Sequence, residues 1–217
     1  MPSMRIRRPV VPSSRLTPSR FHTRYYQSGT GLQAANWLFN QAKQLAAPNP
    51  AITVQRFNHT RFQQPSIIAR LPGNSSSLVV VGAHLDSIGS SPTGRSPGAD
   101  DDGSGTVVVL EALRVLAASG LRPRNTIEFH WYAAEECGYG CSDHASARAN
   151  GFREFSFYPW RSVVLSAAAA AFVAEDTFEN SNKYIHSAND TYDKIMWPTI
   201  LLHAKMVVSY LLEASYI

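Results

Sequence analysis

The spacing of apolar and polar positions predicts a helix followed by short strands in the first third of the chain. Apolar side chains recur at helical intervals over residues 28–46, and Ser28 or Thr30 is the expected N-cap. Residues 51–57 and 66–71 have the short, β-branched or alternating character of strands, and a Pro-Gly-Asn turn follows the second. This region is therefore expected to open an α/β fold.

The middle of the chain repeats a strand, loop, helix, strand order. The run 78–81 is apolar throughout, which predicts a strand that is buried on both faces. A helix is expected over 106–119, ended by Gly120, and a strand over 127–132. A last apolar helix over 198–212 should pack on the sheet. The order indicates an α/β fold with a central mixed, largely parallel sheet flanked by helices.

Polar clusters follow the predicted strands, where α/β sheets bind ligands. His84 and Asp86 stand directly after the first buried strand. Alternate residues of an extended segment point to opposite sides, so His84 is the candidate ligand and Asp86 a carboxylate that orients it or a neighbour. On its own, such a pair is more often structural.

The three adjacent aspartates Asp100, Asp101 and Asp102 strengthen the case for a cation site. Neighbouring carboxylates repel one another unless a cation neutralises them. A solvated acidic loop would also explain the run, and Asp102 is well placed to act simply as the N-cap of the following helix.

Glu135 and Glu136 follow the next predicted strand. One glutamate can bind a metal while its neighbour accepts a proton from water. An acidic pair at a helix N-terminus would be the ordinary alternative. His186 lies in a later loop, where a histidine by itself is usually a surface residue.

Composition and charge narrow the class of protein. The hydrophobic fraction of 44% and the charged fraction of 17% are globular values. The formal charge of +4 is uneven, because arginines crowd the start of the chain, so residues 1–20 are expected to be a flexible basic leader or the remnant of a pro-segment, ahead of a single domain over 21–217. Nucleic-acid binding is not expected, since no recognition module follows the arginines. No run is long and apolar enough to span a membrane, and no signal peptide is visible.

The ordered motifs resemble those of the M28 family of zinc aminopeptidases, and most closely those of secreted fungal leucine aminopeptidases. The matching segments are Gly-Ala-His-Leu-Asp-Ser, Pro-Gly-Ala-Asp-Asp-Asp-Gly-Ser-Gly, Tyr-Ala-Ala-Glu-Glu and Tyr-Ile-His-Ser-Ala-Asn-Asp-Thr. The resemblance also takes in Arg24-Tyr25-Tyr26-Gln27-Ser28 and covers most of residues 21–147 and 174–195. It implies a zinc exopeptidase-type fold, peptide substrates with a free N-terminus, and two zinc ions.

The resemblance implies a role for each motif residue. It assigns His84 to the first zinc and Asp101 to a position that bridges both ions. It assigns Glu136 to the second zinc, and His186 completes the shell of that zinc's partner. It makes Glu135 the general base and Asp86 a carboxylate behind the ligands. It further implies a disulfide between Cys137 and Cys141 and a substrate-facing Tyr139.

The chain departs from the family pattern in two places. Relatives carry a long segment, with an aspartate that is the fifth protein ligand, between the Glu-Glu pair and the Cys-Gly-Tyr motif, whereas Cys137 here follows Glu136 directly. Residues 153–170 are, conversely, an insertion without a family counterpart. The domain is therefore expected to be incomplete, a single-zinc site with three remaining ligands becomes an alternative to the two-zinc site, and aminopeptidase activity is expected to be impaired.

Two other classes of function stay open at this stage. One is a non-catalytic scaffold or binding protein of the same fold, and the other is a metallohydrolase with a different substrate, such as a carboxypeptidase or deacetylase. By the resemblance alone the protein is expected to be secreted and monomeric. Three glycosylation sequons, at Asn58, Asn74 and Asn189, support secretion only weakly.

Overall fold

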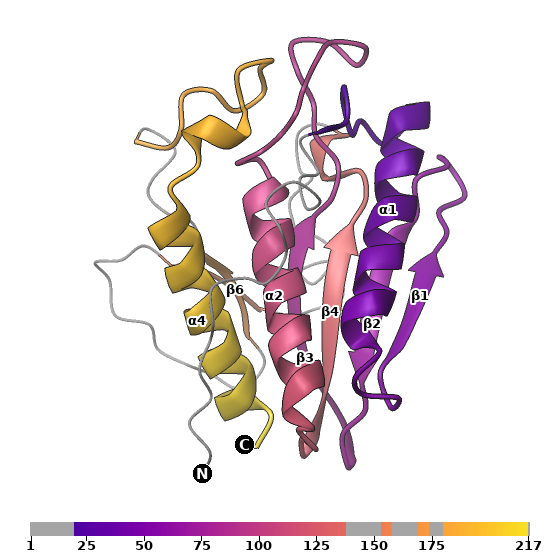
Figure 1. Ribbon diagram of the computed structural model, residues 1–217, viewed down its shortest axis with the longest axis vertical. Helices are drawn as coiled ribbons and strands as arrows, with labels where there is room; N and C mark the ends of the chain where they lie inside the picture. The colour runs from indigo at the N-terminus through magenta and orange to yellow at the C-terminus, as the bar shows by residue number, and fades with distance from the viewer. Residues whose placement is uncertain (1–19, 138–152, 158–168, 174–179, 217) are drawn as a thin grey trace.

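The computed structural model describes residues 20–137, 153–157, 169–173 and 180–216, in which a layer of helices packs on a sheet (Figure 1). The elements in chain order are α1 (Gly29–Ala46), β1 (Thr53–Phe57), β2 (Ser66–Leu71), β3 (Ser75–His84), α2 (Gly103–Ser119), β4 (Asn125–Tyr132), η2 (Glu135–Cys137), β5 (Arg153–Phe157), β6 (Ala169–Val173), η3 (Tyr192–Lys194) and α4 (Trp197–Ala214).

The central sheet has four strands in the order β1-β2-β4-β3. The β1–β2 and β2–β4 pairs are antiparallel, and the β3–β4 pair is parallel. A separate parallel pair is formed by β5 and β6, within and beside the segment expected to be an insertion. The expected mixed sheet with flanking helices is confirmed. The expectation that this sheet is largely parallel is wrong for the described strands, because β3 and β4 are the one parallel pair among its three. That parallel pair brings the carboxyl ends of both strands to one edge, where His84 and the Glu135-Glu136 pair follow.

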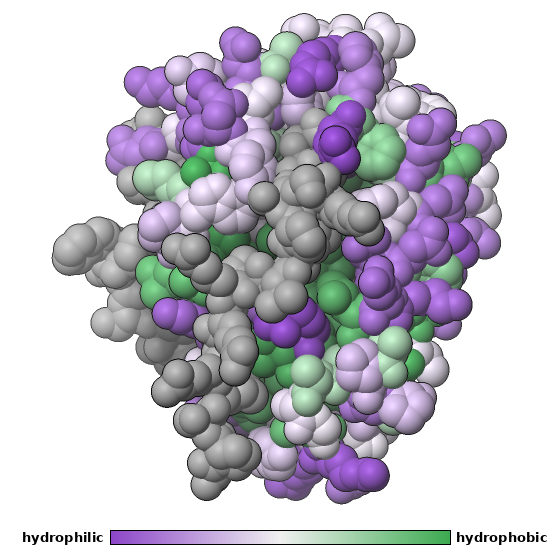
Figure 2. Space-filling model, in the orientation of Figure 1, coloured by the Kyte–Doolittle hydropathy of each residue, from purple (hydrophilic) through white to green (hydrophobic). Residues whose placement is uncertain are grey.

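The hydrophobic core lies between the sheet and the helices. On β2 and β4 every second side chain faces this layer, as the two-residue period of a strand requires. On these two strands the largest fully buried apolar side chains are Ile67, Leu71, Ile127, Phe129 and Trp131. Helices α1, α2 and α4 stand side by side over them in Figure 1, with α4 packed chiefly against α2. Hydrophilic side chains cover α1 and the loops above the helices in the space-filling view (Figure 2).

The expectation that residues 78–81 form a strand buried on both faces is wrong. Leu78 is 52% exposed and Val80 is 41% exposed, whereas Val79 is buried. Among the described residues β3 pairs only with β4, so it ends the four-stranded sheet. The three helices cover the face to which Val79 points, and Leu78 and Val80 lie on the other face.

The capping groups set where the helices begin and end. The Ser28 hydroxyl accepts a hydrogen bond from the Gly31 amide at 2.9 Å, so Ser28, and not Thr30, caps α1. The Asp102 carboxylate accepts from the Gly105 amide at 2.8 Å and caps α2, which therefore starts at Gly103, earlier than the sequence pattern predicts. Gly120 ends α2 in the left-handed conformation, with φ of 66°. The N-cap fixes Asp101 immediately ahead of the helix.

No helix in the described part of the chain is long and apolar enough to cross a membrane. The expected leader lies outside the described residues except for Arg20.

Candidate metal centre

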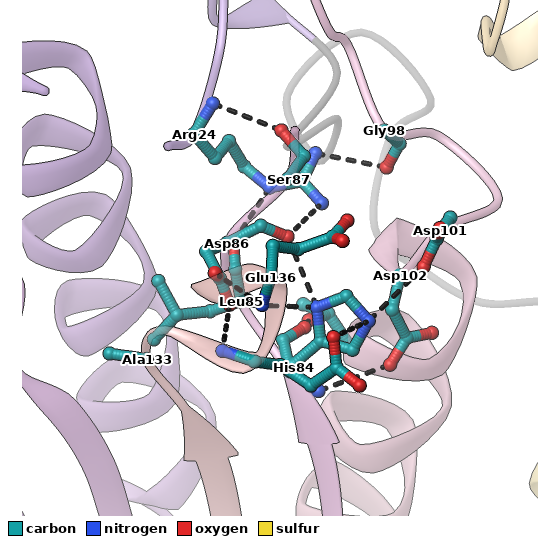
Figure 3. Close-up of polar contacts among 12 residues, drawn as sticks. Arg24, His84, Leu85, Asp86, Ser87, Gly98, Asp101, Asp102, Ala133 and Glu136 are labelled. Carbon is teal, nitrogen blue, oxygen red and sulfur yellow. Dashed lines mark hydrogen bonds and ion pairs between the residues drawn. The ribbon is translucent and has the colours of Figure 1, made fainter. Parts of the chain in front are cut away.

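Three ligand-type side chains from separate parts of the sequence meet at the carboxyl edge of the sheet. His84 is the last residue of β3, Asp101 precedes the N-cap of α2, and Glu136 lies in the short turn η2 after β4. One ligand atom from each lies within 4.8 Å of the other two (Figure 3). The loop before η3 brings His186 to the same point. The structure thus gathers the four residues that the sequence analysis nominated as ligands.

The carboxylate of Asp101 lies between the two histidines. Its Oδ1 is 3.1 Å from His84 Nε2, and its Oδ2 is 3.0 Å from His186 Nε2. His186 Nε2 is also 3.1 Å from Glu136 Oε2. One oxygen of Asp101 therefore shares its surroundings with Glu136 and His186, and the other faces His84.

Glu135 lies on the His84 side of this cluster. Its Oε2 is 4.0 Å from His84 Nε2. The fully buried carboxylate of Asp86 holds the turn that carries both glutamates, since it accepts hydrogen bonds from the Glu135 and Glu136 amides, each at 3.1 Å. Asp86 Oδ1 is also 3.6 Å from His84 Nδ1. The residue thus contacts both the histidine and the glutamate turn.

A buried arginine braces the loops behind these residues. Arg24 is 1% exposed and donates from Nε to the Leu85 carbonyl at 2.7 Å and from Nη1 to the Pro97 and Gly98 carbonyls (Figure 3). Burial lowers the pKa of its guanidinium, although nearby Asp86 counteracts that effect. Gly98 packs so closely here, with φ of 55°, that an added Cβ would lie 2.6 Å from the Asp101 carbonyl oxygen. Arg24 thereby joins the segment after β3 to the segment before α2.

A buried aspartate from the last loop holds the backbone beside Asp101. Asp190 is 0% exposed, and its carboxylate accepts hydrogen bonds from the Asp100 amide at 2.9 Å and the Asp101 amide at 3.1 Å. Asn182 adds a second tie, because its side-chain amide donates to Asp100 Oδ2 at 2.8 Å. The loop that carries His186 is thus fastened to the aspartate run on both sides of the histidine.

The protonation of the metal-free cluster reflects its crowded acids. Burial, together with the charge of Asp101, raises the pKa of Glu136 to about 8. The hydrogen bond with Asp101 and the charge of Glu136 raise the pKa of His186 to about 9. Burial alone would raise the pKa of Asp101, but hydrogen bonds with His186 and His84 outweigh it and hold that pKa well below its usual range. Burial likewise raises the pKa of Asp190.

The residues present fit a zinc ion. Imidazole nitrogens and carboxylate oxygens are zinc ligands in proteins. Glu136 Oε1 is buried and, within the described residues, has no hydrogen-bond partner, although a buried polar atom normally has one. A cation would supply that partner and balance the adjacent carboxylates. Two backbone positions here are unusual as well: Ala134 and His186 adopt positive φ angles of 65° and 56°, and such positions cluster at functional sites.

Some residues with an expected role lie outside the described part of the chain, and two others have a role that the sequence does not indicate. Tyr139 and Cys141 lie outside the described residues, so the substrate contact and the disulfide with Cys137 stay predictions. Arg24 and Asp190 were quoted only as parts of motifs, without a role. The available signal was that an aspartate follows each histidine of the site closely, at Asp86 and at Asp190.

Known proteins resemble this chain in sequence and in fold. A sequence model described as Peptidase family M28 matches residues 66–140 and 136–211. A probable leucine aminopeptidase of Trichophyton verrucosum is 35% identical over 273 aligned residues, which cover 90% of this chain and 70% of the relative. Among solved structures, Legionella pneumophila LapA aligns with a TM-score of 0.77 at 23% identity, over 92% of this chain and 71% of LapA. BSAP, a zinc aminopeptidase from Bacillus subtilis, aligns with a TM-score of 0.53 at 20% identity, over 73% of this chain and 52% of BSAP.

These alignments indicate an internal gap in this chain relative to its relatives. The 273 aligned positions exceed the 217 residues of this chain, so the Trichophyton relative has residues without a counterpart here. The two family matches meet at residues 136–140, at the Glu136–Cys137 junction. Both findings agree with the gap expected after Glu136.

Proposed function

Because the chain belongs to peptidase family M28, we propose that it is a zinc-dependent aminopeptidase that removes the N-terminal residue from peptides. The observation that carries the proposal is the convergence of His84, Asp101 and Glu136, whose ligand atoms lie within 4.8 Å of one another, with Glu135 beside them. A binding scaffold has no need of an acidic cluster that leaves a buried carboxylate oxygen of Glu136 without a partner among the described residues.

We assign one tightly bound zinc to Asp101 Oδ2, Glu136 and His186. Three protein ligands are the usual complement of a catalytic zinc site. Asp101 Oδ2 lies 3.0 Å and Glu136 Oε2 lies 3.1 Å from His186 Nε2. On the His84 side, the contacts among the described residues include Asp101 Oδ1 at 3.1 Å and Glu135 at 4.0 Å. A second ion there would have two protein ligands and would bind more weakly.

In this proposal Glu135 is the proton acceptor and its neighbours position it. Bound zinc supplies a Lewis acid that polarises the scissile carbonyl and acidifies water. Glu135 accepts the proton of the attacking water and passes it to the departing amine. Asp86 fixes the Glu135 amide, and therefore the approach of that carboxylate, at 3.1 Å.

Substrate class and location follow from the relatives rather than from the site. The Trichophyton relative is named a probable leucine aminopeptidase, so a peptide with N-terminal leucine is the substrate proposed here. Secretion and a monomeric state, both expected from the family resemblance, are proposed on the same ground.

A leucine amide assay with a free and a blocked amine tests the activity. The zinc-loaded 217-residue protein should hydrolyse leucine p-nitroanilide and leave the N-acetylated compound intact. Replacing Glu135 with Gln should lower kcat by about 10²–10⁴-fold while zinc remains bound, as measured by metal analysis of the dialysed protein. Equal cleavage of the blocked amide would point to another metallohydrolase, and zinc binding without cleavage of either compound would favour a binding scaffold.

Matched histidine variants test the assignment of the tight ion. His186→Ala should abolish stoichiometric zinc binding, whereas His84→Ala should retain one tightly bound ion per chain. The reverse result, with the tight ion lost from His84→Ala only, would move the site to the other oxygen of Asp101.

A further inference from the structure

Among the described residues, the hydrogen bonds of the Asp190 carboxylate all go to backbone amides. Its two carboxylate oxygens each accept one amide, Oδ1 from Asp100 at 2.9 Å and Oδ2 from Asp101 at 3.1 Å. Its own carbonyl accepts from the Ala99 amide at 3.2 Å. Three hydrogen bonds thus join this one residue to three consecutive residues, and the side chain is fully buried.

The same arrangement recurs on the opposite side of the site. Asp86, just after His84, accepts the consecutive amides of Glu135 and Glu136. Asp190, just after His186, accepts the consecutive amides of Asp100 and Asp101. In both cases an aspartate that closely follows a histidine accepts the amides of an acidic pair from another part of the chain. The hydrogen bonds therefore couple the position of each histidine to that of the acids it faces.

The consequence for Asp101 is geometric. Its carboxylate must present Oδ1 to His84 and Oδ2 to His186 at the same time, at 3.1 and 3.0 Å. Ligand positions must be held to about 0.5 Å for a metal site to work, and a side chain is no better placed than its backbone. Asp190 fixes that backbone, and its own loop carries His186.

We infer that Asp190 is a positioning residue that sets the Asp101 carboxylate and His186 at the correct separation for the metal. The inference rests on the proposed zinc-dependent function. It predicts that the position of the Asp190 carboxylate determines the zinc affinity. A negative charge near the site is not sufficient by itself.

The test is zinc affinity of Asp190→Asn, measured by competition with a chromophoric chelator. The amide keeps the shape of the carboxylate but has a single acceptor oxygen, so one of the two backbone N–H groups would face an NH₂ group. Zinc affinity should fall by about 10–100-fold, as when a residue behind the ligands is lost. In the leucine amide assay kcat should fall while KM stays nearly unchanged.

Two further variants separate positioning from charge and from general damage. Asp193→Asn makes the same change on an exposed aspartate of the same region, which bonds Thr191 and Lys194, and should keep wild-type zinc affinity. Asp190→Glu keeps the charge but displaces it by a methylene, so positioning predicts weaker zinc binding here too. This variant also serves as the test if Asp190→Asn fails to fold, as judged by circular dichroism.

Wild-type zinc affinity in a folded Asp190→Asn or Asp190→Glu protein would overturn the inference and leave the proposed function standing. A wild-type protein that binds no zinc would overturn both, so the two failures are distinguishable.

Discussion

At pH 7, two ligand side chains of the metal-free site carry protons. The pKa of His186 is raised to about 9 by Asp101 and Glu136, and the pKa of Glu136 is raised to about 8 by burial and by Asp101. Each proton occupies an atom that must be free to bind a metal, since zinc is held by neutral imidazole and ionised carboxylate. Zinc and protons therefore compete for the same residues.

The competition predicts that zinc binding at pH 7 releases protons and strengthens with pH. Below about 8 both groups are protonated in the metal-free state, and above about 9 neither is, so affinity should rise between pH 6 and 9 and then level off. Calorimetry in two buffers of different ionisation enthalpy measures the protons released. A zinc affinity that is constant from pH 6 to 9 would contradict the shifts.

Arg24 should contribute strongly to stability although it is not part of the site's chemistry. In Arg24→Met, the buried carbonyls of Leu85 and Pro97 lose the Arg24 donor, whereas the Gly98 carbonyl keeps the hydrogen bond from the Gly103 amide. Each unsatisfied buried group costs about 1–3 kcal/mol, so the free energy of unfolding should fall by at least about 2 kcal/mol, out of a typical total of about 5–15 kcal/mol. Urea denaturation measures the loss.

The matched control for this substitution is Arg56→Met. Arg56 is exposed, bonds Asn36 and lies over the Phe39 ring, and its loss should cost about 1 kcal/mol or less. Equal effects of the two substitutions would mean that the buried contacts of Arg24 do not stabilise the fold.

At the level of single residues, the sequence motifs nominate the candidate ligands but not the residues that hold them in place. His84, Asp101, Glu136 and His186 could be nominated because their spacing matches a family motif. Arg24 and Asp190 could not be given a role, since each acts on backbone groups 61 to 90 residues away in the sequence. No local pattern encodes such a contact, and only the folded chain reveals it.

At the scale of helices and strands, local chemistry determined the boundaries that were predicted best. The strand 66–71 was predicted to the residue, and Gly120 ends α2 as expected. The environment of residues 78–81 was misjudged because an apolar run does not report what covers it. Two of its side chains are exposed in a strand that ends the sheet. Burial of a strand depends on its neighbours, which periodicity does not identify.

Two helix-end glycines offer a test of backbone conformation with side-chain contacts held equal. A Cβ at Gly120 or at Gly29 would meet nothing within 4 Å, but only Gly120 has a positive φ, of 66°. Gly120→Ala should therefore destabilise by about 1–2 kcal/mol, whereas Gly29→Ala, at the first turn of α1, should stabilise by up to about 1 kcal/mol. Chemical denaturation of both variants measures the difference, and a stabilising Gly120→Ala would contradict the left-handed cap.

At the scale of the whole molecule, the internal gap is the main departure from the relatives. The Trichophyton relative aligns over more positions than this chain has residues, and the two family matches meet at the Glu136–Cys137 junction. The gap follows the turn that carries Glu135 and Glu136. The family resemblance implies that this gap removes a strand and a fifth ligand.

Restoring the relative's segment after Glu136 should raise aminopeptidase activity. The added carboxylate would supply the fifth ligand that the family resemblance implies, and losing a group behind the ligands alone typically costs about 10–100-fold, so kcat should rise by at least about tenfold. The assay is leucine p-nitroanilide hydrolysis by both proteins at saturating zinc. Equal turnover would show that the segment is dispensable for catalysis.

The hydrogen bonds that the Asp190 carboxylate accepts from the Asp100 and Asp101 amides close a loop of about ninety residues. This long loop has a consequence for biosynthesis. A ribosome makes the chain from its N-terminus, so His84, Asp101 and Glu136 emerge before the loop that carries His186. Long loops close late, because their entropy cost precedes any contact that repays it. In the proposed site, a growing chain thus exposes an incomplete acidic cluster, and tight zinc binding must wait until the loop that carries His186 has left the ribosome.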